Sequence, residues 1–187
     1  MLPAGLALLA FSPQAVAAGA SASPRAYFDL RPMLAQNALG YFPFTPSIPM
    51  LYGLRESLAM LSEEGMAQVI SRHARLARGV RAAVSAWSLP ICCRDPAAVS
   101  NTVTTIMTPD GVDANRMIAR AFTQYNLALG AGLGPLSGKA FRIGHVGDLN
   151  EGMVLGALGL VEMVLMDAGA TLRPGSGVAA AQTVWRT

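Results

Sequence analysis

The chain has 187 residues and a net charge of +3; hydrophobic residues make up 52% of it and charged residues 13%. That charged share lies well below the ~25% typical of soluble domains, so the chain either buries a large core or leaves apolar surface for a partner. Its arginines are scattered and Lys139 is its only lysine, without the basic patch and interleaved aromatics that would indicate nucleic-acid binding.

The cysteine content argues against a disulfide framework and against a metal site. Cys92 and Cys93 are adjacent and are the only cysteines of the chain. Neighbouring cysteines do not form a structural staple, and no CxxC pair supplies zinc-ligand spacing. Unpaired thiols favour a reducing compartment, so we expect a cytoplasmic protein. No apolar run reaches the ~18 residues of a membrane span, and no membrane contact is expected.

The apolar start of the chain, MLPAGLALLAFSPQAVAAGASASP, admits two interpretations. Leu6 to Phe11 is a continuous apolar run, typical of a strand covered on both faces, and Ser12 with Pro13 is typical of a helix start. The alternative is a signal peptide of a secreted protein, with AVA as its cleavage site. A signal peptide has a basic segment before its apolar core, whereas the first basic residue here is Arg25, so strand and helix are favoured.

An aromatic, proline-rich segment follows, from Tyr27 to Pro49. Its prolines exclude a long helix across the later part, and we expect an irregular segment with a short helical turn near Met33 to Asn37. Exposed loops are seldom this aromatic. We therefore expect Tyr41, Phe42 and Phe44 to pack against another element or another subunit.

The longest predicted helix runs from about Met50 to Trp87. Apolar residues follow one face at steps of three and four: Leu54, Leu58, Leu61, Val69, His73, Leu76, Val80, Val84 and Trp87. Gly65 occupies the missing step and is expected to bend the helix or to allow close packing. His73 is expected to be packed rather than to bind a metal. Arginines recur on another face and are expected to be solvated or paired with acids, with a phosphate or partner site as the alternative: Arg72, Arg75, Arg78 and Arg81.

The remaining residues are predicted to form a small α+β domain. Its expected elements are a strand within 100–109, a helix within 110–126, a flexible glycine-rich loop at 127–138, a strand at 139–146 and a helix at 150–169. Asn150 is the expected N-cap of the last helix. The tail from Thr171 is expected to be loose.

The strand at 139–146 contains the candidate binding residue, Arg142. Side chains alternate across a strand, so Arg142 shares a face with the small residues Ala140 and Gly144, and the opposite face has Phe141, Ile143 and His145. This pattern leaves room for a ligand beside the guanidinium, which binds a carboxylate through two parallel hydrogen bonds. The alternative is an ion pair with an acid of the same domain, such as Asp148.

Three segments occur in the order LYGLRESLAMLSEEG, NTVTTIMTPDGVD and GAGLGPLSGKAFRIGHVGD. In these segments the chain resembles the C-terminal half of class V aminotransferases, specifically the serine–glyoxylate and alanine–glyoxylate branch. The resemblance covers nearly the whole chain and is most specific from Gly132 to Gly147. It implies an α/β fold class, a partial pyridoxal-phosphate transferase fold like that of aspartate aminotransferase. The implied domains are the C-terminal remnant of the large cofactor-binding domain at 1–49, an interdomain helix at 50–88 and a small α+β domain at 89–187.

The resemblance also implies a function and its site residues. The family consists of pyridoxal 5'-phosphate enzymes, usually homodimers, and this branch would transfer an amino group from serine or alanine to glyoxylate or a similar 2-oxo acid. Arg142 matches the residue that holds the substrate carboxylate, and Thr45 matches a threonine that reaches the cofactor phosphate of the neighbouring subunit. Many members have a tyrosine three residues before that threonine. This chain has Phe42 there, and Tyr41, one position away, would have to replace it.

The family's Schiff-base lysine lies in a Ser-Gln-Lys motif just before a segment like MLPAGLALLAFS, with which this chain begins. Lys139 matches a different motif, beside Arg142. We therefore expect a truncated chain that contains no catalytic residue, is inactive alone and, with its apolar first strand unpaired, dissolves poorly. The alternative function is a non-catalytic module that binds small carboxylates through Arg142 or pairs with an aminotransferase subunit.

Overall fold

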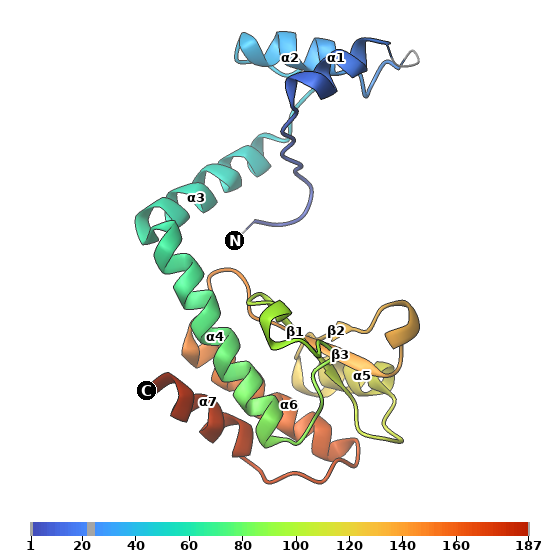
Figure 1. Cartoon of the computed structure of the whole chain (residues 1–187), viewed down its shortest axis with the longest axis vertical. Helices are drawn as coiled ribbons and strands as arrows, with labels where there is room; N and C mark the ends of the chain where they lie inside the picture. Colours follow the sequence, from blue (N-terminus) through green and yellow to red (C-terminus); the bar gives the residue numbers. More distant parts are fainter. Residues whose placement is uncertain (1, 22–24, 187) are drawn as a thin grey trace. The chain divides into compact units, whose positions relative to one another are not determined.

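The computed structural model describes residues 2–21 and 25–186, which form two compact units that divide between Glu63 and Glu64 (Figure 1). Among the residues described, the first unit contains the helices α1 (Pro13–Ser21), α2 (Leu30–Ala38) and nearly all of α3 (Ile48–Glu64). The second contains α4 (Met66–Ala86), α5 (Ala114–Tyr125), α6 (Glu151–Asp167), α7 (Ser176–Arg186) and the sheet. Within these ranges, no helix has both the length and the apolar character that crossing a membrane requires.

The first two helices begin where their capping residues predict. The Ser12 hydroxyl accepts a hydrogen bond from the Ala15 backbone N–H at 3.2 Å, which confirms the expected start of α1. Asp29 caps α2 by accepting from the Arg31 N–H at 3.0 Å. The short helical turn expected near Met33 is therefore a complete helix of nine residues.

The buried strand predicted at Leu6 to Phe11 is not formed, whereas the expectation that this segment is unpaired agrees with the structure. These residues form neither a helix nor a paired strand, and Leu8 is 74% and Leu9 71% exposed. A buried strand needs neighbours to pair with, and the described part of the chain supplies none. Among the three aromatics expected to be packed, Phe44 stacks on Tyr27 with ring centroids 4.6 Å apart, but Tyr41 is 67% and Phe42 49% exposed.

The continuous helix predicted from Met50 to Trp87 is interrupted at Gly65, between α3 and α4. The φ of Gly65 is +83°, in the region that glycine enters at little cost and that an α-helix excludes. The apolar stripe is buried along α4, where it supplies Leu76, Val80 and Val84 to the core. The predicted periodicity was thus correct for α4, and the glycine at the missing step ends one helix and begins the next.

A three-stranded antiparallel sheet forms the centre of the second unit, in the order β1 (Val103–Met107), β3 (Ala140–Gly144) and β2 (Gly130–Ala131). The two long strands are those the sequence predicts. The short strand β2 lies in the stretch expected to be a flexible loop, so that expectation is wrong at these two residues. One face of the sheet supplies Ile106, Phe141 and Ile143 to a core that α4, α5 and α6 complete.

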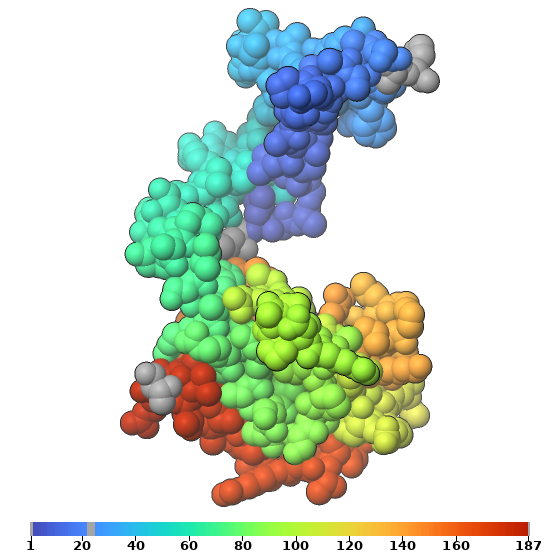
Figure 2. All heavy atoms as spheres, in the orientation of Figure 1, coloured from blue at the N-terminus to red at the C-terminus, as the bar shows by residue number. Residues whose placement is uncertain are grey.

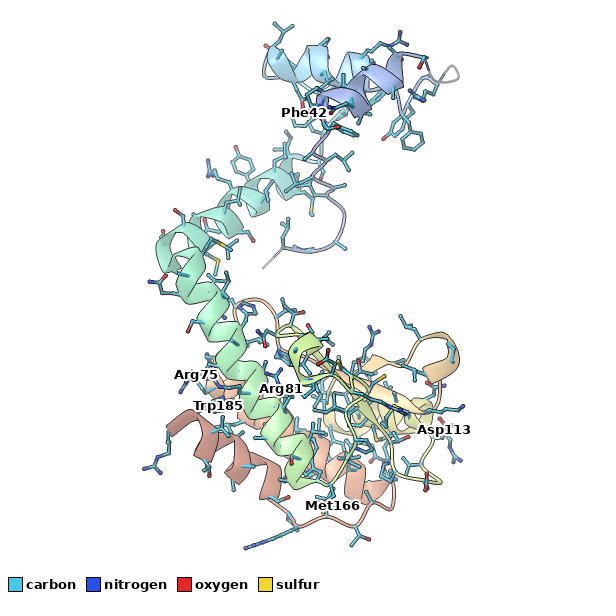
Figure 3. All side chains as sticks on the ribbon, viewed as in Figure 1. Phe42, Arg75, Arg81, Asp113, Met166 and Trp185 are labelled. Carbon is cyan, nitrogen blue, oxygen red and sulfur yellow. The ribbon has the colours of Figure 1, made fainter. Side chains whose placement is uncertain are left out.

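The tail expected to be loose contains α7, which lies along α4 (Figure 1). Trp185 of α7 donates from Nε1 to the Arg75 carbonyl of α4 at 2.8 Å, and Figure 3 shows these two residues side by side. Glu162 of α6 is buried and accepts from the backbone N–H groups of Gly175 and Gly177 at 2.7 and 2.6 Å. These bonds hold the start of α7 in place.

Candidate functional site

Arg142 lies in the middle strand of the sheet, between one residue of each neighbouring strand. Thr105 of β1 and Gly130 of β2 are its cross-strand partners. Cross-strand partners project from the same face of a sheet, so Thr105 shares the face of Arg142. The opposite face carries Phe141 and Ile143, which are 0% and 5% exposed. The predicted alternation of β3 is therefore confirmed: its bulky residues enter the core and Arg142 lies on the other face, half-buried.

Hydrogen bonding distinguishes Arg142 from the other arginines of the second unit. Its Nε is buried without a hydrogen-bond partner, and within the described ranges the residue forms no ion pair. The internal ion pair with Asp148, which the sequence left open, is not formed. A buried N–H without a partner is energetically costly. The guanidinium of Arg142 thus keeps the capacity to bind one carboxylate through two hydrogen bonds.

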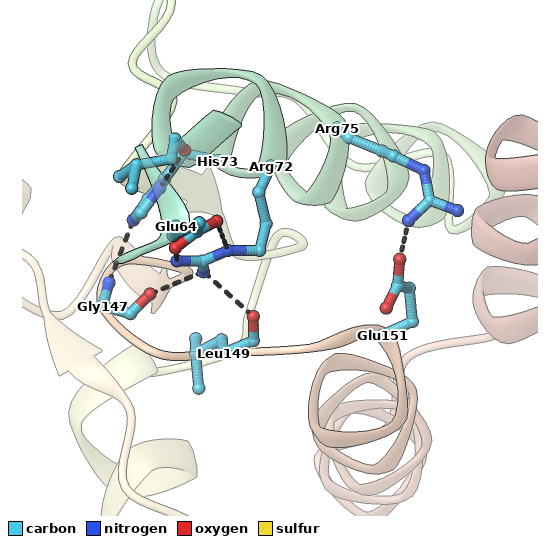
Figure 4. A network of polar contacts seen from close by, with 8 residues as sticks. Glu64, Arg72, His73, Arg75, Gly147, Leu149 and Glu151 are labelled. Atoms are coloured by element: carbon cyan, nitrogen blue, oxygen red, sulfur yellow. Dashed lines mark hydrogen bonds and ion pairs between the residues drawn. The ribbon is translucent and has the colours of Figure 1, made fainter. Parts of the chain in front are cut away.

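The arginine row on α4 behaves as the sequence predicts at two of its positions. Arg72 pairs with Glu64 and Arg75 pairs with Glu151, as Figure 4 shows. Arg81 donates instead to the carbonyl of Ser100 at 3.1 Å, and burial lowers the pKa of its guanidinium. Because these side chains are occupied by partners inside the unit, the row offers no continuous phosphate or partner site.

The loop that follows β3 is fixed to α4 by Arg72 and His73 (Figure 4). Arg72 Nη1 donates to the carbonyls of Gly147 and Leu149 at 2.8 and 3.1 Å. His73 Nε2 accepts from the Gly147 N–H at 3.0 Å, so its proton lies on Nδ1, which donates to the Val69 carbonyl at 2.7 Å. His73 is buried with both ring nitrogens satisfied, which confirms the prediction of a packed histidine.

The segment before β3 is also tied down, although its sequence suggested flexibility. The Gly138 carbonyl accepts from the Ala114 N–H at 3.0 Å, at the first residue of α5. The Lys139 carbonyl accepts from both the N–H and the hydroxyl of Thr108, at 3.0 and 3.1 Å. Lys139 thus fixes the start of β3 through its backbone while the residue itself is exposed. In Figure 2, the segment around Lys139 lies at the surface of the second unit.

The other two candidate residues, Thr45 and Tyr41, lie in the first unit. They line an open hollow of about 870 Å³ formed by residues 40–46 and Ile48. The Tyr41 backbone is held by two hydrogen bonds of 2.9 Å, from its N–H to the Gln36 carbonyl and to its carbonyl from Asn37 Nδ2. Thr45 is exposed three residues before the first residue of α3.

The donors of this hollow suit a phosphate group. The dipole and the unbonded N–H groups of a helix N-terminus favour an anion, although Pro49 removes one of these N–H groups from α3; the Thr45 hydroxyl adds a further donor. The residues present therefore fit the phosphate of a cofactor such as the one the sequence resemblance implies. Within the described ranges, no group of three or more His, Cys, Asp or Glu side chains gathers as metal ligands would.

Sequence reasoning identified Arg142 but not the residues around it. The positions of Thr105 and Gly130 beside Arg142 follow from the strand register, and β2 is too short to give a recognisable pattern. The contact of Arg72 with the loop after β3 joins residues about 75 positions apart. Only the FRIGH stretch itself gave a local signal, through its alternation.

No family model matches the chain. Among curated proteins, it is 52% identical to a serine–glyoxylate aminotransferase of Methylorubrum extorquens over 100% of the chain and 48% of that protein. It is 44% identical to an L-aspartate–glyoxylate aminotransferase of Paracoccus denitrificans over 100% of the chain and 47% of that protein. The chain thus spans about half the length of the curated relatives it matches.

A solved structure gives the same result. The ureidoglycine–glyoxylate aminotransferase of Bacillus subtilis superposes with a TM-score of 0.77 at 28% identity. That match covers 86% of this chain and 42% of the other chain. Similarity in sequence and similarity in fold therefore select the same group of proteins, over a similar share of their length.

Proposed function

The chain belongs to the class V aminotransferases, and from this premise we propose that it acts as part of a transaminase that takes an amino group from serine or alanine to glyoxylate or a similar 2-oxo acid. Relatives that span about twice its length include serine–glyoxylate and aspartate–glyoxylate aminotransferases. Nothing in these relatives favours the alternative of a non-catalytic carboxylate-binding module. The predicted fold class, a partial pyridoxal-phosphate transferase fold of the α/β class, is confirmed by the likeness to the Bacillus enzyme.

Arg142 is the proposed substrate-binding residue. Amino acids and 2-oxo acids share a carboxylate, so one guanidinium can hold the donor in one half of the reaction and the acceptor in the other. The observation that carries this proposal is that Arg142 alone combines a buried, unpartnered Nε with the absence of an ion pair in the described part of the chain. Serine, alanine and aspartate present the same carboxylate, so Arg142 binds all three donors and selects none of them.

Thr45 and Tyr41 are the proposed contacts to the cofactor. In the proposed homodimer they serve the pyridoxal 5'-phosphate of the neighbouring subunit, with the hydroxyl of Thr45 and the N-terminus of α3 binding its phosphate. When bound, this cofactor supplies the carbonyl carbon that takes up the amino group and a conjugated ring that withdraws electrons. The residues of this chain would bind the cofactor phosphate and orient the substrate carboxylate. Lys139, which is exposed beside β3, is not proposed as the residue that anchors the cofactor.

A binding experiment tests the role of Arg142 in the chain itself. The 187-residue chain is titrated with glycolate, an unreactive 2-hydroxy acid, and the arginine Nε–H resonances are followed by NMR. We expect saturable binding that Arg142→Gln weakens by at least about tenfold, because a charge-assisted hydrogen bond contributes about 1.5–3 kcal/mol. Arg78→Gln, at an exposed arginine on α4, is the control and should bind normally. Equal affinity in wild type and Arg142→Gln would exclude Arg142 as the carboxylate-binding residue.

A chimera tests the activity. It joins the first half of the Methylorubrum relative to this chain, and transamination between serine and glyoxylate is measured with added pyridoxal phosphate. We expect turnover, with a KM for serine that Arg142→Gln raises and Arg78→Gln leaves unchanged. A folded chimera that binds the cofactor but does not transaminate would contradict the proposed activity.

A further inference from the structure

We propose that Gly130 is a positioning residue for Arg142: without a side chain, it leaves the space in which the guanidinium lies. This inference rests on the proposed function, since it concerns how Arg142 is oriented toward a carboxylate. It adds a residue of β2, twelve positions before Arg142 in the sequence, to the set that determines binding.

The close approach of the two residues is the first step of the argument. Gly130 is the β2 partner of Arg142 in the sheet. A Cβ built on Gly130 would lie 3.0 Å from both the Cβ and the Nε of Arg142 and 3.5 Å from its Cζ. Ordinary contacts between such atoms begin at about 3.5 Å, so a methyl group at this position requires the Arg142 side chain to shift by a few tenths of an ångström.

Backbone conformation does not explain the glycine. Gly130 is absent from the residues with positive φ in the described chain, so an alanine could adopt its backbone angles. Glycine in a strand otherwise weakens it, because it costs backbone entropy and provides no side chain to pack. The substitution Gly130→Ala would instead fill the space beside Arg142.

The side chain of Arg142 has little else to hold it. Its Nε is buried against β2 without a hydrogen bond, and the guanidinium has no ion-pair partner among the described residues. On the β1 side, the cross-strand partner is Thr105. The Arg142 side chain therefore lies against the Gly130 position of β2, and a two-point bond to a carboxylate depends on the orientation of the guanidinium.

The test uses the same 187-residue chain: its affinity for glycolate is measured by calorimetry, and the orientation of Arg142, where that residue is present, is followed by its Nε–H resonance. We expect Gly130→Ala to shift that resonance in the free chain and to weaken glycolate binding about tenfold, as the loss of one of two charge-assisted hydrogen bonds predicts. Gly156→Ala is the matched control. Its added methyl would enter open space on α6, and it should change neither the resonance nor the affinity.

A double-mutant cycle separates positioning from a general structural effect. If Gly130 acts through the guanidinium, Gly130→Ala should cost clearly less affinity in an Arg142→Lys background, because an ammonium group binds a carboxylate without a fixed plane. An equal loss in both backgrounds would overturn the proposal, as would normal binding by Gly130→Ala. In the latter case a loss of binding in Arg142→Gln would still support the proposed function, whereas normal binding in Arg142→Gln would contradict the function itself.

Discussion

Glu64 and Arg72 form a two-point ion pair across the helix break at Gly65, with Nε–Oε1 and Nη2–Oε2 distances of 2.6 and 2.7 Å. The third guanidinium nitrogen of Arg72 binds the loop that follows β3. One arginine therefore joins the end of α3, the first turns of α4 and the loop that follows the strand containing the proposed substrate residue. The pair also makes this connection sensitive to pH.

Acid should weaken this connection. Hydrogen bonds from Arg72 lower the pKa of Glu64 below its ordinary value of 4.5. A carboxyl group whose pKa is lowered by folding stabilises the folded state above that ordinary value, and the contribution is lost as the pH falls through the folded-state pKa. In Glu64→Gln, the free energy of unfolding should therefore fall less steeply below pH 4.5 than in wild type. Glu63→Gln, at the exposed neighbouring residue, should retain the wild-type slope.

A second pH effect is expected at a higher pH, from His145. Burial lowers the pKa of His145 below its ordinary 6.5, and its ring nitrogens bond to Thr104 Oγ1 and the Asn101 carbonyl at 2.9 and 3.1 Å. Since the unfolded chain takes up this proton first, stability is complete above pH 6.5 and falls as the pH drops below it. The loss can reach about 1.4 kcal/mol per pH unit for one proton.

Chemical denaturation at a series of pH values measures this effect. The positive charge of Arg81 also disfavours protonation of His145. We expect His145→Gln to flatten the decline between pH 6.5 and 5. An unchanged slope in that variant would assign the decline to other groups.

Glu162→Gln tests the docking of α7. The Glu162 carboxylate accepts from Trp87 Nε1 at 2.8 Å and from two backbone N–H groups before and within α7. A buried amide replaces one acceptor oxygen by a donor group, which leaves at least one buried donor without a partner and should cost about 1–3 kcal/mol. Hydrogen exchange should accelerate in α7 before it does in the sheet. Asp110→Asn, at an exposed acid, is the control; equal exchange in both variants would argue against the anchoring role of Glu162.

Lys139→Arg should leave turnover of the chimera within about twofold of its starting value, because Lys139 is exposed and contributes to β3 through its carbonyl. The lysine of the Ser-Gln-Lys motif in the other half should be indispensable in the same assay. If the Lys139→Arg chimera folds normally but loses activity, Lys139 has a role in catalysis and this prediction is wrong.

The sequence predicted those elements whose signals are local. Ser12 and Asn150 cap the helices that follow them, and the alternation in β3 correctly placed Arg142 on the face opposite Phe141. The errors occur where a distant partner decides the structure. The helix α7 depends on Glu162, and the strand β2 depends on its register with β3. Leu6 to Phe11, in turn, has the composition of a paired strand but no partner in the described residues.

The candidate site shows the same division. The alternating pattern of its strand identified Arg142 as a candidate binding residue. Only the structure shows that Arg142 forms no ion pair with the described residues. The roles of Arg142, Thr45 and Tyr41, and the division into segments 1–49, 50–88 and 89–187, stay predictions. They depend on a ligand, a cofactor or a second subunit, whose contacts are not encoded in any local pattern of residues.

The position of α7 has a consequence for the folding of the second unit during synthesis. Ala181 belongs to the core, and Trp185 bonds to the carbonyl of Arg75 in α4, which is synthesised 110 residues earlier. The second unit therefore cannot close its core before α7 has been synthesised, and until then the apolar face of α4 that α7 covers stays exposed. Such a nascent chain depends on chaperones for longer than one that folds segment by segment.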